Sequence, residues 1–557
     1  MEELVSIYCI NNGENKKYKP GTQLVEIYND LQLKVPNRVM NARVNNKTKS
    51  LTYRVYNPKD VEFIDITHPS GMRTYIRSLC FILYRAIQEL YPDARFRIEH
   101  TVAKGIYCSI DKANEFSEQE VHDLKIRMQE IINQDIPIQY IEDKTERVKE
   151  LFRKENNKDI ANLLDSISTP YTGYYKMDDY LDYYYGSLVP STGYIYLFDI
   201  VKFAKGVLLR VPSVSYPQLL EDIIQQPKMM EIFTEQRNWN KIMHLSNVGD
   251  YNKICADGHA SVIIKVSEAL HEKKISRIAD DILNRREQGI NTRFVLISGP
   301  SSSGKTTFSK RLAIQLITNG LVPVTISLDN YFVERVNTPK DETGNYDYES
   351  LYALDLPLFN QQLQQLANGE EVKLPTYSFE TGKRIYKGNK LRINKNTVII
   401  IEGIHALNPL LTPDIDDELK YKIYVSALTT ISLDDHNWIP TTDNRLLRRI
   451  IRDYRYRGYS AKETISRWPS VRKGEDKWIF PYQENADVMF NSALLFELAV
   501  IKRYVEPILS EVPSNCEEYA EADRLLRFLS YFRPIYNSDI PPTSLLREFV
   551  GGSSFKY

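Results

Sequence analysis

The stretch GPSSSGKTTFSKRL, residues 299–312, decides the fold of the second half of the chain. Gly299, Gly304, Lys305 and Thr306 have the spacing G-x-x-x-x-G-K-[ST] of a phosphate-binding loop. Glycines let the backbone wrap around phosphate oxygens, N–H groups at a helix start point at them, and the threonine hydroxyl can bind Mg²⁺. We expect the nucleotide phosphates to be held by Gly299, Ser301, Ser302, Ser303, Gly304, Lys305, Thr306 and Thr307.

The sequence around this loop has an α/β pattern. The apolar run RFVLIS (293–298) precedes the loop, and two further apolar runs are VPVTISLD (322–329) and TVIII (397–401). Helical patterns run from Gly304 to about 319 and from about 357 to 368. Continuous apolar strands that alternate with helices predict a parallel sheet covered on both faces, with ligands at the carboxyl ends of its strands.

Three acidic residues lie where such a sheet would bring them to the loop. Asp329 ends the second strand, Glu402 follows the third, and Asp347 lies in the loop GNYDYES. A single acid after a strand is more often a turn former or helix cap. Two acids at two strand ends beside a phosphate loop favour a functional role instead, so we expect Mg²⁺ to be held by Thr306 with Glu402 or Asp329.

The segment 445–457 carries a regular series of arginines. Arg445, Arg448, Arg449 and Arg452 have the spacing of one helical face. A solvated charge stripe, an RNA-binding surface and a lid over ATP are all compatible with this spacing. The position after the predicted Mg²⁺ acid favours the lid.

Ordered blocks over residues 290–500 resemble the uridine kinase and phosphoribulokinase family of P-loop kinases. They are ISGPSSSGKTTFSKRL, SLDNYF, NYD, LPTYSF, VIIIEGIHAL, RLLRRIIRDYRYRG and YQENADVMFNSAL. The resemblance implies ATP with Mg²⁺ and transfer of phosphate to a ribose 5′-hydroxyl. It also implies that Asp329 is the catalytic base, that Lys305 and the lid arginines Arg449, Arg452 and Arg457 act on the phosphates, and that the acceptor contacts Asp347, Tyr377, Phe379 and Arg452.

The chain departs from uridine and cytidine kinases at positions near the acceptor. Gly382 stands in place of a base-reading histidine, Arg467 in place of a glutamine, and Tyr459 in place of a further lid arginine. Asp347 is followed by Tyr-Glu instead of His-Pro. The phosphate chemistry is therefore carried over better than pyrimidine recognition.

The first half resembles a different enzyme. Residues 1–66 are similar to a TGS domain, a β-grasp module of threonyl-tRNA synthetase, and the segment from DITHPSG onward is similar to the editing-type domain that follows it. The HxxxH and CxxxH metal motifs of that domain are missing, so we expect His68 and His100 to be ordinary polar residues and the metal chemistry to be lost. Charged helices are expected near 115–133 and 144–165, and nine tyrosines lie between Tyr171 and Tyr196.

The predicted fold class is α/β, a P-loop kinase with a parallel sheet and a helical lid, preceded by a β-grasp TGS module and an α+β synthetase-editing-like domain. The predicted parts are the β-grasp module (1–66), the synthetase-like domain (67–225), a helical connector (226–289), the P-loop domain (290–510) and a C-terminal helical extension (511–557).

Bulk properties limit the partners. The net charge is −1, so no whole-chain charge favours nucleic acid or an anionic membrane. The first residues lack the pattern of a signal peptide and no apolar run reaches the ~18 residues of a membrane span. The five cysteines are scattered, which fits a reducing cytoplasm.

We therefore expect a nucleoside kinase with a small-molecule acceptor. A phosphoribulokinase-like sugar kinase and an RNA- or ribosome-associated ATP switch stay open as alternatives, and so does a homo-oligomer.

Overall fold

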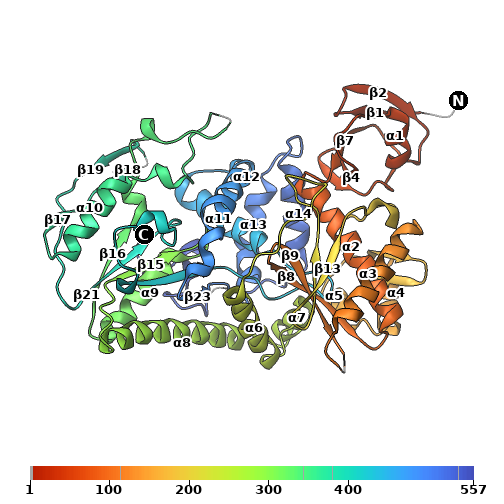
Figure 1. The fold of residues 1–557 in the computed structure, drawn as a ribbon. Coiled ribbons are helices and arrows are strands. Elements are labelled where there is room, and N and C mark those ends of the chain that lie inside the picture. The colour runs from red at the N-terminus through yellow and green to blue at the C-terminus, as the bar shows by residue number, and fades with distance from the viewer. Residues whose placement is uncertain (1–3, 113, 343, 379, 537, 557) are drawn as a thin grey trace.

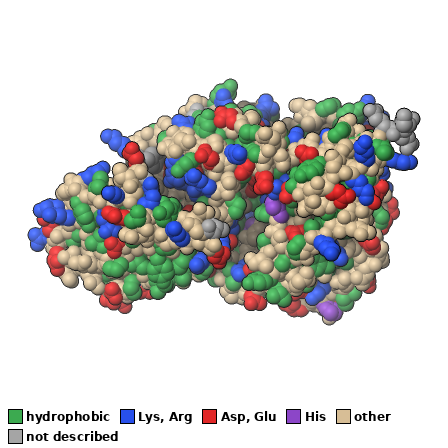
Figure 2. Space-filling view, turned by 90° about the horizontal axis from the view of Figure 1, so that it is seen from above, with side chains coloured by type: hydrophobic (Ala, Val, Ile, Leu, Met, Phe, Trp, Pro, Cys, Tyr) green, Lys and Arg blue, Asp and Glu red, His purple; other side chains and the backbone are tan. Residues whose placement is uncertain are grey.

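The computed structural model describes residues 4–112, 114–342, 344–378, 380–536 and 538–556. Figure 1 shows the N-terminal half on the right and the C-terminal half on the left, with the long helix α8 (Ala260–Glu287) running beneath the latter. Seen from above, two lobes flank a hollow, and basic and acidic side chains are mixed over both lobes (Figure 2).

The N-terminal module is a mixed sheet with one helix packed on it. The sheet has the order β2-β1-β7-β4-β5, in which β1 and β7 are parallel and the other pairs are antiparallel. Leu24, Ile27 and Leu31 of helix α1 are buried in the module's core. This is the predicted β-grasp fold. Its elements are β1 (Val5–Cys9), β2 (Glu14–Tyr18), β3 (Thr22–Gln23), α1 (Leu24–Leu31), β4 (Val39–Val44), β5 (Lys47–Lys49), β6 (Arg54–Val55) and β7 (Lys59–Asp65).

The next part combines two antiparallel sheets with helices. One sheet has the order β13-β14-β9-β8 and the other the order β10-β11-β12. The helix predicted over 144–165 is two helices, because Asn156 adopts a left-handed φ of 61° between them. The elements are α2 (Pro69–Leu90), β8 (Arg95–Val102), β9 (Gly105–Asp111), α3 (Glu118–Asn133), β10 (Gln139–Lys144), α4 (Thr145–Lys154), α5 (Lys158–Asp165), β11 (Tyr171–Met177), β12 (Tyr180–Asp182), β13 (Asp199–Phe203) and β14 (Gly206–Arg210).

Three helices lead from this part into the C-terminal half. They are α6 (Pro227–Ile242), α7 (Val248–Ala256) and α8. Ile275, Ile278 and Ile282 of α8 share a buried core with Leu312 and Leu316 of the helix that follows the phosphate loop. Helix α8 therefore supports that helix from outside.

The C-terminal half is built on a five-stranded sheet in which every pair is parallel, in the order β16-β21-β15-β22-β23. This arrangement confirms the predicted α/β fold. The strands are β15 (Phe294–Ser298), β16 (Val322–Ser327), β21 (Thr397–Glu402), β22 (Lys420–Ser426) and β23 (Val488–Asn491). Short hairpin strands lie beside it: β17 (Val372–Lys373), β18 (Thr376–Ser378), β19 (Lys383–Ile385) and β20 (Lys390–Leu391).

Helices cover this sheet, and the last residues return to it. Helix α9 follows the phosphate loop (Figure 1), and near the chain end the Lys556 carbonyl accepts from Lys310 and the Val550 carbonyl accepts from Arg455 at 2.8 Å. In the described part of the chain no helix is both long and apolar enough to cross a membrane. The helices are α9 (Lys305–Thr318), α10 (Leu356–Ala367), α11 (Thr441–Arg457), α12 (Ala461–Trp478), α13 (Glu497–Ser510), α14 (Tyr519–Ser530) and α15 (Arg547–Val550).

Candidate active site

The loop from Gly299 to Gly304 connects the end of β15 to the start of α9. A Cβ atom at Gly299 would lie 1.9 Å from the carbonyl oxygen of Val425, so no other residue fits there. Gly304 precedes the helix with a left-handed φ of +83°, which favours glycine. The first N–H groups of α9 have no partner inside the helix and point into the loop. This is the geometry of an anion-binding helix start.

Lys305 is the first residue of α9 and closes the loop. Its Nζ donates to the carbonyl oxygens of Gly299 at 2.8 Å and Pro300 at 3.1 Å. Burial lowers the pKa of Lys305, the carboxylates of Glu402 and Asp329 oppose this, and Arg452 adds to it. Lys305 therefore feels the charge of acids at two strand ends and of an arginine on α11.

The predicted metal residues Thr306 and Glu402 are in contact. The hydroxyl of Thr306 donates to Glu402 Oε1 at 3.3 Å. Burial raises the pKa of Glu402 to about 7, with Lys305 pulling it back. An oxygen pair of this kind suits Mg²⁺, which usually keeps several waters and needs few protein ligands. No cluster of three or more His, Cys, Asp or Glu that could hold a metal occurs among the described residues.

The loop also fits the phosphates. The hydroxyls of Ser302 and Ser303 are buried without a hydrogen-bond partner, and both lie inside the loop. Buried polar groups are normally satisfied, and phosphate oxygens would accept from these two hydroxyls. The residues present are therefore suited to a triphosphate with Mg²⁺.

Asp329 lies just beyond β16, in a short 3₁₀ turn over Leu328–Tyr331. The predicted strand is two residues too long, because the Ser327 hydroxyl accepts from the Asp329 N–H and starts the turn. The carboxylate is open to solvent although protein atoms crowd around it. This crowding raises the pKa of Asp329, while Lys305, Arg457 and Arg452 lower it. Because water still reaches the group, we expect a modest net rise.

Two of the predicted lid arginines contact the loop. Arg449 Nη1 donates to Ser301 Oγ at 2.8 Å, and Arg452 Nη2 donates to the same oxygen at 3.4 Å. Burial and the neighbouring Arg457 lower the pKa of Arg452 to about 10. Arg457 is exposed and pairs with Asp453 at 3.1 Å. These side chains place positive charge beside the loop, which can offset charge on a transferred phosphoryl group.

The other two arginines of the series lie behind the loop, so the four do not form one face over the nucleotide. Arg445 is buried, pairs with Glu475 and donates to the Ser301 carbonyl at 3.0 Å. Arg448 is also buried, pairs with Glu497 and donates to the Ser302 carbonyl at 3.3 Å. Both hold the loop backbone from the inside.

Of the predicted acceptor residues, Asp347 lies in a loop after β16, Tyr377 in strand β18 and Arg452 on α11. Asp347 is half-buried, and its carboxylate accepts from the Glu349 N–H at 3.1 Å. Tyr377 is 7% exposed and packs near Phe332, so little of its ring is open to a ligand. Tyr346 and Tyr348, on either side of Asp347, are exposed. Phe379 lies outside the described residues.

The positions that depart from the uridine kinase pattern have structural partners. Gly382 adopts a φ of +67° next to the β18–β19 hairpin, and a Cβ there would lie 2.8 Å from Arg335. The guanidinium of Arg467 lies 4.3 Å from the centroid of the Tyr459 ring. Arg467 therefore stacks on Tyr459, so two of the substituted positions contact each other.

Three acidic residues near the loop were not predicted. Burial raises the pKa of Glu349 to about 7, with Arg449 and Lys305 opposing it. Glu475 accepts from the Ser301 N–H at 2.9 Å, and Glu548 of α15 accepts from the Thr307 hydroxyl at 2.6 Å. Glu349 could have been found from the sequence, because it belongs to the Tyr-Glu pair that replaces His-Pro after Asp347. Glu475 and Glu548 follow the loop by 174 and 241 residues, and nothing local marks them.

His68 and His100, the two histidines weighed against a metal motif, both have structural surroundings. His68 caps α2 by accepting from the Ser70 N–H at 3.0 Å, and burial with Arg43 nearby lowers its pKa to about 4. His100 stacks on Phe233, with the ring centroids 3.4 Å apart.

The C-terminal half is similar to known kinases. Residues 294–496 match the model of the phosphoribulokinase / uridine kinase family. Over 199 residues the chain is 31% identical to a uridine kinase of Staphylococcus aureus (strain JH9). The aligned stretch covers 36% of this chain and 86% of that enzyme. A solved structure of a possible uridine kinase from Bacillus stearothermophilus shares 22% identity, covers 36% of this chain and 89% of that chain, and has a TM-score of 0.25.

The N-terminal region is similar to a different protein. A threonine–tRNA ligase of Fusobacterium nucleatum is 26% identical over 179 residues, which are 32% of this chain and 29% of that ligase. Synthetase-like modules therefore precede the P-loop half.

Proposed function

Because the chain belongs to the phosphoribulokinase / uridine kinase family, we propose that this P-loop kinase transfers the γ-phosphate of ATP to the 5′-hydroxyl of a nucleoside. The observation that carries the proposal is the phosphate loop, which Lys305 closes at 2.8 Å from the Gly299 carbonyl oxygen and which has the Thr306–Glu402 contact at 3.3 Å beside it. The named activity of relatives such as the Staphylococcus aureus uridine kinase supports the choice of acceptor.

The proposed chemistry uses these residues in distinct roles. Asp329 accepts the proton of the acceptor hydroxyl. The oxygen of that hydroxyl bonds to the γ-phosphorus while the bond between the γ-phosphorus and the ADP oxygen breaks. Lys305 and Arg452 provide positive charge where negative charge gathers on the phosphoryl oxygens. Thr306 and Glu402 would hold Mg²⁺, which neutralises phosphate charge when bound.

The acceptor pocket is proposed to hold the sugar through Asp347 and the base through aromatic side chains. The Asp347 carboxylate can accept hydrogen bonds from ribose hydroxyls. Exposed Tyr346 and Tyr348 offer ring faces on either side of it, in addition to the small exposed edge of Tyr377. Stacking accepts any base, whereas polar contacts discriminate strongly. Since Gly382 offers no side chain to read a base, we expect looser base choice than in uridine and cytidine kinases.

The test is an acceptor panel with the product identified by mass spectrometry. We would measure kcat/KM for uridine, cytidine, adenosine, guanosine, inosine and ribulose 5-phosphate, with 5′-deoxyuridine as the matched control because it lacks the acceptor hydroxyl. We expect nucleoside 5′-monophosphates from several nucleosides and none from 5′-deoxyuridine. Sole use of ribulose 5-phosphate would show a sugar kinase. ATP hydrolysis that RNA stimulates without any acceptor would show an ATP switch.

A further inference from the structure

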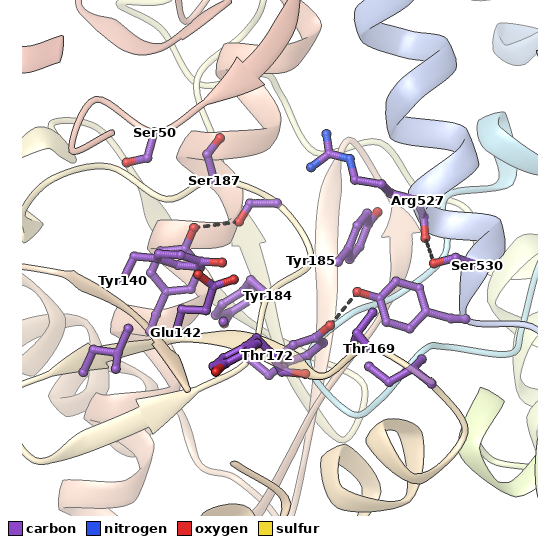
Figure 3. A pocket seen from close by; sticks show the side chains of 18 of the residues that line it. Ser50, Tyr140, Glu142, Thr169, Thr172, Tyr184, Tyr185, Ser187, Arg527 and Ser530 are labelled. Atoms are coloured by element: carbon purple, nitrogen blue, oxygen red, sulfur yellow. Dashed lines mark hydrogen bonds between the residues drawn. The ribbon is translucent and has the colours of Figure 1, made fainter. Parts of the chain in front are cut away.

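A large cavity lies away from the phosphate loop. It has a volume of about 1830 Å³ and is lined by the β-grasp module, by β10 and β11, by residues 183–187 and by the C-terminal helix α14. Figure 3 shows side chains from these elements around one space, with Tyr140 and Glu142 on one side and Arg527 on the other. The proposed kinase function gives this cavity no role.

The walls of the cavity are tied together by specific bonds. Ser50 Oγ of the β-grasp module donates to the Leu188 carbonyl at 3.1 Å. The hydroxyls of Tyr183 and Tyr531 are 2.5 Å apart, and Asn252 Nδ2 donates to the Tyr531 carbonyl at 2.7 Å. These contacts join segments more than 100 residues apart, so the cavity is a built feature and not a loose gap.

Aromatic rings make up much of the lining. One series runs from Tyr140 to Tyr175, with centroids 5.3 Å apart, and on to Tyr184 at 6.4 Å. Across the cavity, Tyr185 and Tyr531 lie 6.3 Å apart. Tyr140 is 52% exposed, so part of its ring is open to a ligand. The tyrosine-rich segment noted in the sequence supplies several of these rings.

Cations gather on the Arg527 side. The Lys49 ammonium lies 5.1 Å from the Tyr53 ring centroid and makes no ion pair within the described ranges. Arg527 pairs with Asp523 at 2.9 Å but keeps 48% of its side chain exposed. Burial lowers the pKa of Lys49 and repulsion from Arg527 lowers it further, whereas Asp523 and Glu142 oppose this. An anion placed between these two side chains would relieve their repulsion.

A third cation lies beneath the tyrosines. Arg77 of α2 is 8% exposed, and its guanidinium lies 5.1 Å from the Tyr185 ring centroid. A Cβ at Gly186 would lie 2.2 Å from Arg77 Nη1, so the glycine makes room for it. In the part of the chain that the structure describes, Arg77 forms no ion pair. A buried cation without a counter-charge keeps the surrounding potential positive.

Three acids of the lining are bonded elsewhere or lie across from Arg527. Asp165 is engaged by Arg153 at 3.0 Å and by Lys149 at 3.3 Å. Asp250 accepts from the Ser246 N–H at 3.1 Å. Glu142 lies across the cavity from Arg527, next to Tyr140 (Figure 3). The cavity thus has an aromatic wall and a basic wall.

We propose that this cavity is a second ligand site, which binds a nucleoside phosphate with its base on the Tyr140 wall and its phosphate between Lys49 and Arg527. Tyrosine faces suit any base, and charge-assisted hydrogen bonds suit a phosphate. A single-stranded nucleic acid fits less well, because it needs a basic path along its length, whereas Glu142, Asp165 and Asp250 interrupt the lining.

The test uses the full chain with the candidate active site disabled by Lys305→Ala and Asp347→Ala. Binding of radiolabelled uridine 5′-monophosphate and adenosine 5′-monophosphate would be measured by equilibrium dialysis. We expect binding that Arg527→Gln weakens ~10-fold or more, the size of one lost charge-assisted hydrogen bond. Tyr140→Ala should weaken it several-fold. Arg147→Gln is the matched control, because Arg147 is 70% exposed and does not line the cavity.

Photocrosslinking locates the ligand independently. Irradiated 5-iodouridine 5′-monophosphate should label a tyrosine between 140 and 185, and peptide mass spectrometry would identify it. Melting temperatures within a few degrees of the parent would show that the variants fold. Absence of binding at millimolar concentration, binding that Arg527→Gln leaves unchanged, or labelling confined to residues 344–378 would overturn the proposal. Tight binding of a 12-nucleotide oligouridylate that neither monophosphate displaces would overturn it in favour of a nucleic-acid surface.

Discussion

Removing one partner of the ion pair behind the phosphate loop is expected to destabilise the protein strongly. Arg448 and Glu497 are both 0% exposed, and Arg448 Nη2 donates to Glu497 Oε2 at 2.7 Å. We consider Glu497→Gln, which keeps the shape of the side chain and removes its charge. The substitution leaves a guanidinium in the core without a counter-charge.

The structure sets the size of the effect. Breaking a buried pair by removing one partner costs about 3–5 kcal/mol. Arg448 keeps the Ser492 carbonyl at 2.9 Å, the Ser302 carbonyl at 3.3 Å and the ring of Phe549 at 5.0 Å from its Cζ. These contacts place the expected loss at the lower end, about 3 kcal/mol. For a unit of about 200 residues this corresponds to a melting temperature lower by roughly 6–12 °C.

The assay is thermal unfolding followed by circular dichroism, with two comparison proteins. Lys473→Ala removes an exposed pair with Glu342 and should leave the melting temperature nearly unchanged, because solvent screens such a pair. The double variant Arg448→Met, Glu497→Met should be more stable than Glu497→Gln, because neither position then leaves an unpaired charge in the core. A Glu497→Gln protein that melts within 1–2 °C of wild type would refute the reasoning.

Three further outcomes concern the site itself. Lys305→Ala should remove about 3 kcal/mol of transition-state stabilisation and so slow phosphate transfer, while the melting temperature stays unchanged. Full turnover in this variant would contradict the phosphate-loop role. Asp329→Asn should bind ATP normally and transfer phosphate at least ~100-fold more slowly, whereas lost ATP affinity with unchanged turnover would indicate a structural or metal-binding role. Glu349 has a folded-state pKa raised to about 7, above its unfolded value, so it should reduce stability as pH rises from about 4.5 to 7. Glu349→Gln should therefore flatten the melting temperature over that window, and an unchanged pH profile would argue against a buried Glu349 carboxyl.

The parallel sheet and the loop could be predicted from the sequence because their signals are local. Continuous apolar runs mark strands that are buried on both faces, and the glycine spacing marks the loop. Lys305, Thr306 and Glu402 lie together as expected, because the carboxyl ends of parallel strands share one edge.

Other features depend on contacts that periodicity cannot reveal. The spacing of the four arginines places them on one face of a helix. It does not reveal that other helices pack against α11 and bury part of that face. Arg445 and Arg448 are buried because Glu475 and Glu497, on later helices, supply counter-charges. The cavity walls likewise come from segments that meet only in the folded chain, so the tyrosines alone did not indicate a site.

The contact between Thr307 and Glu548 has a consequence for synthesis of the protein. Glu548 follows Thr307 by 241 residues, so the hydroxyl at the start of α9 lacks this partner until the segment has been translated. At ~5–20 residues per second this takes on the order of 10–50 s. A nascent chain in that interval has a complete phosphate-loop sequence without the helix that covers it. Ribosome-bound chains halted before residue 545 should therefore expose this part of the loop to proteases, and chains released beyond residue 550 should protect it.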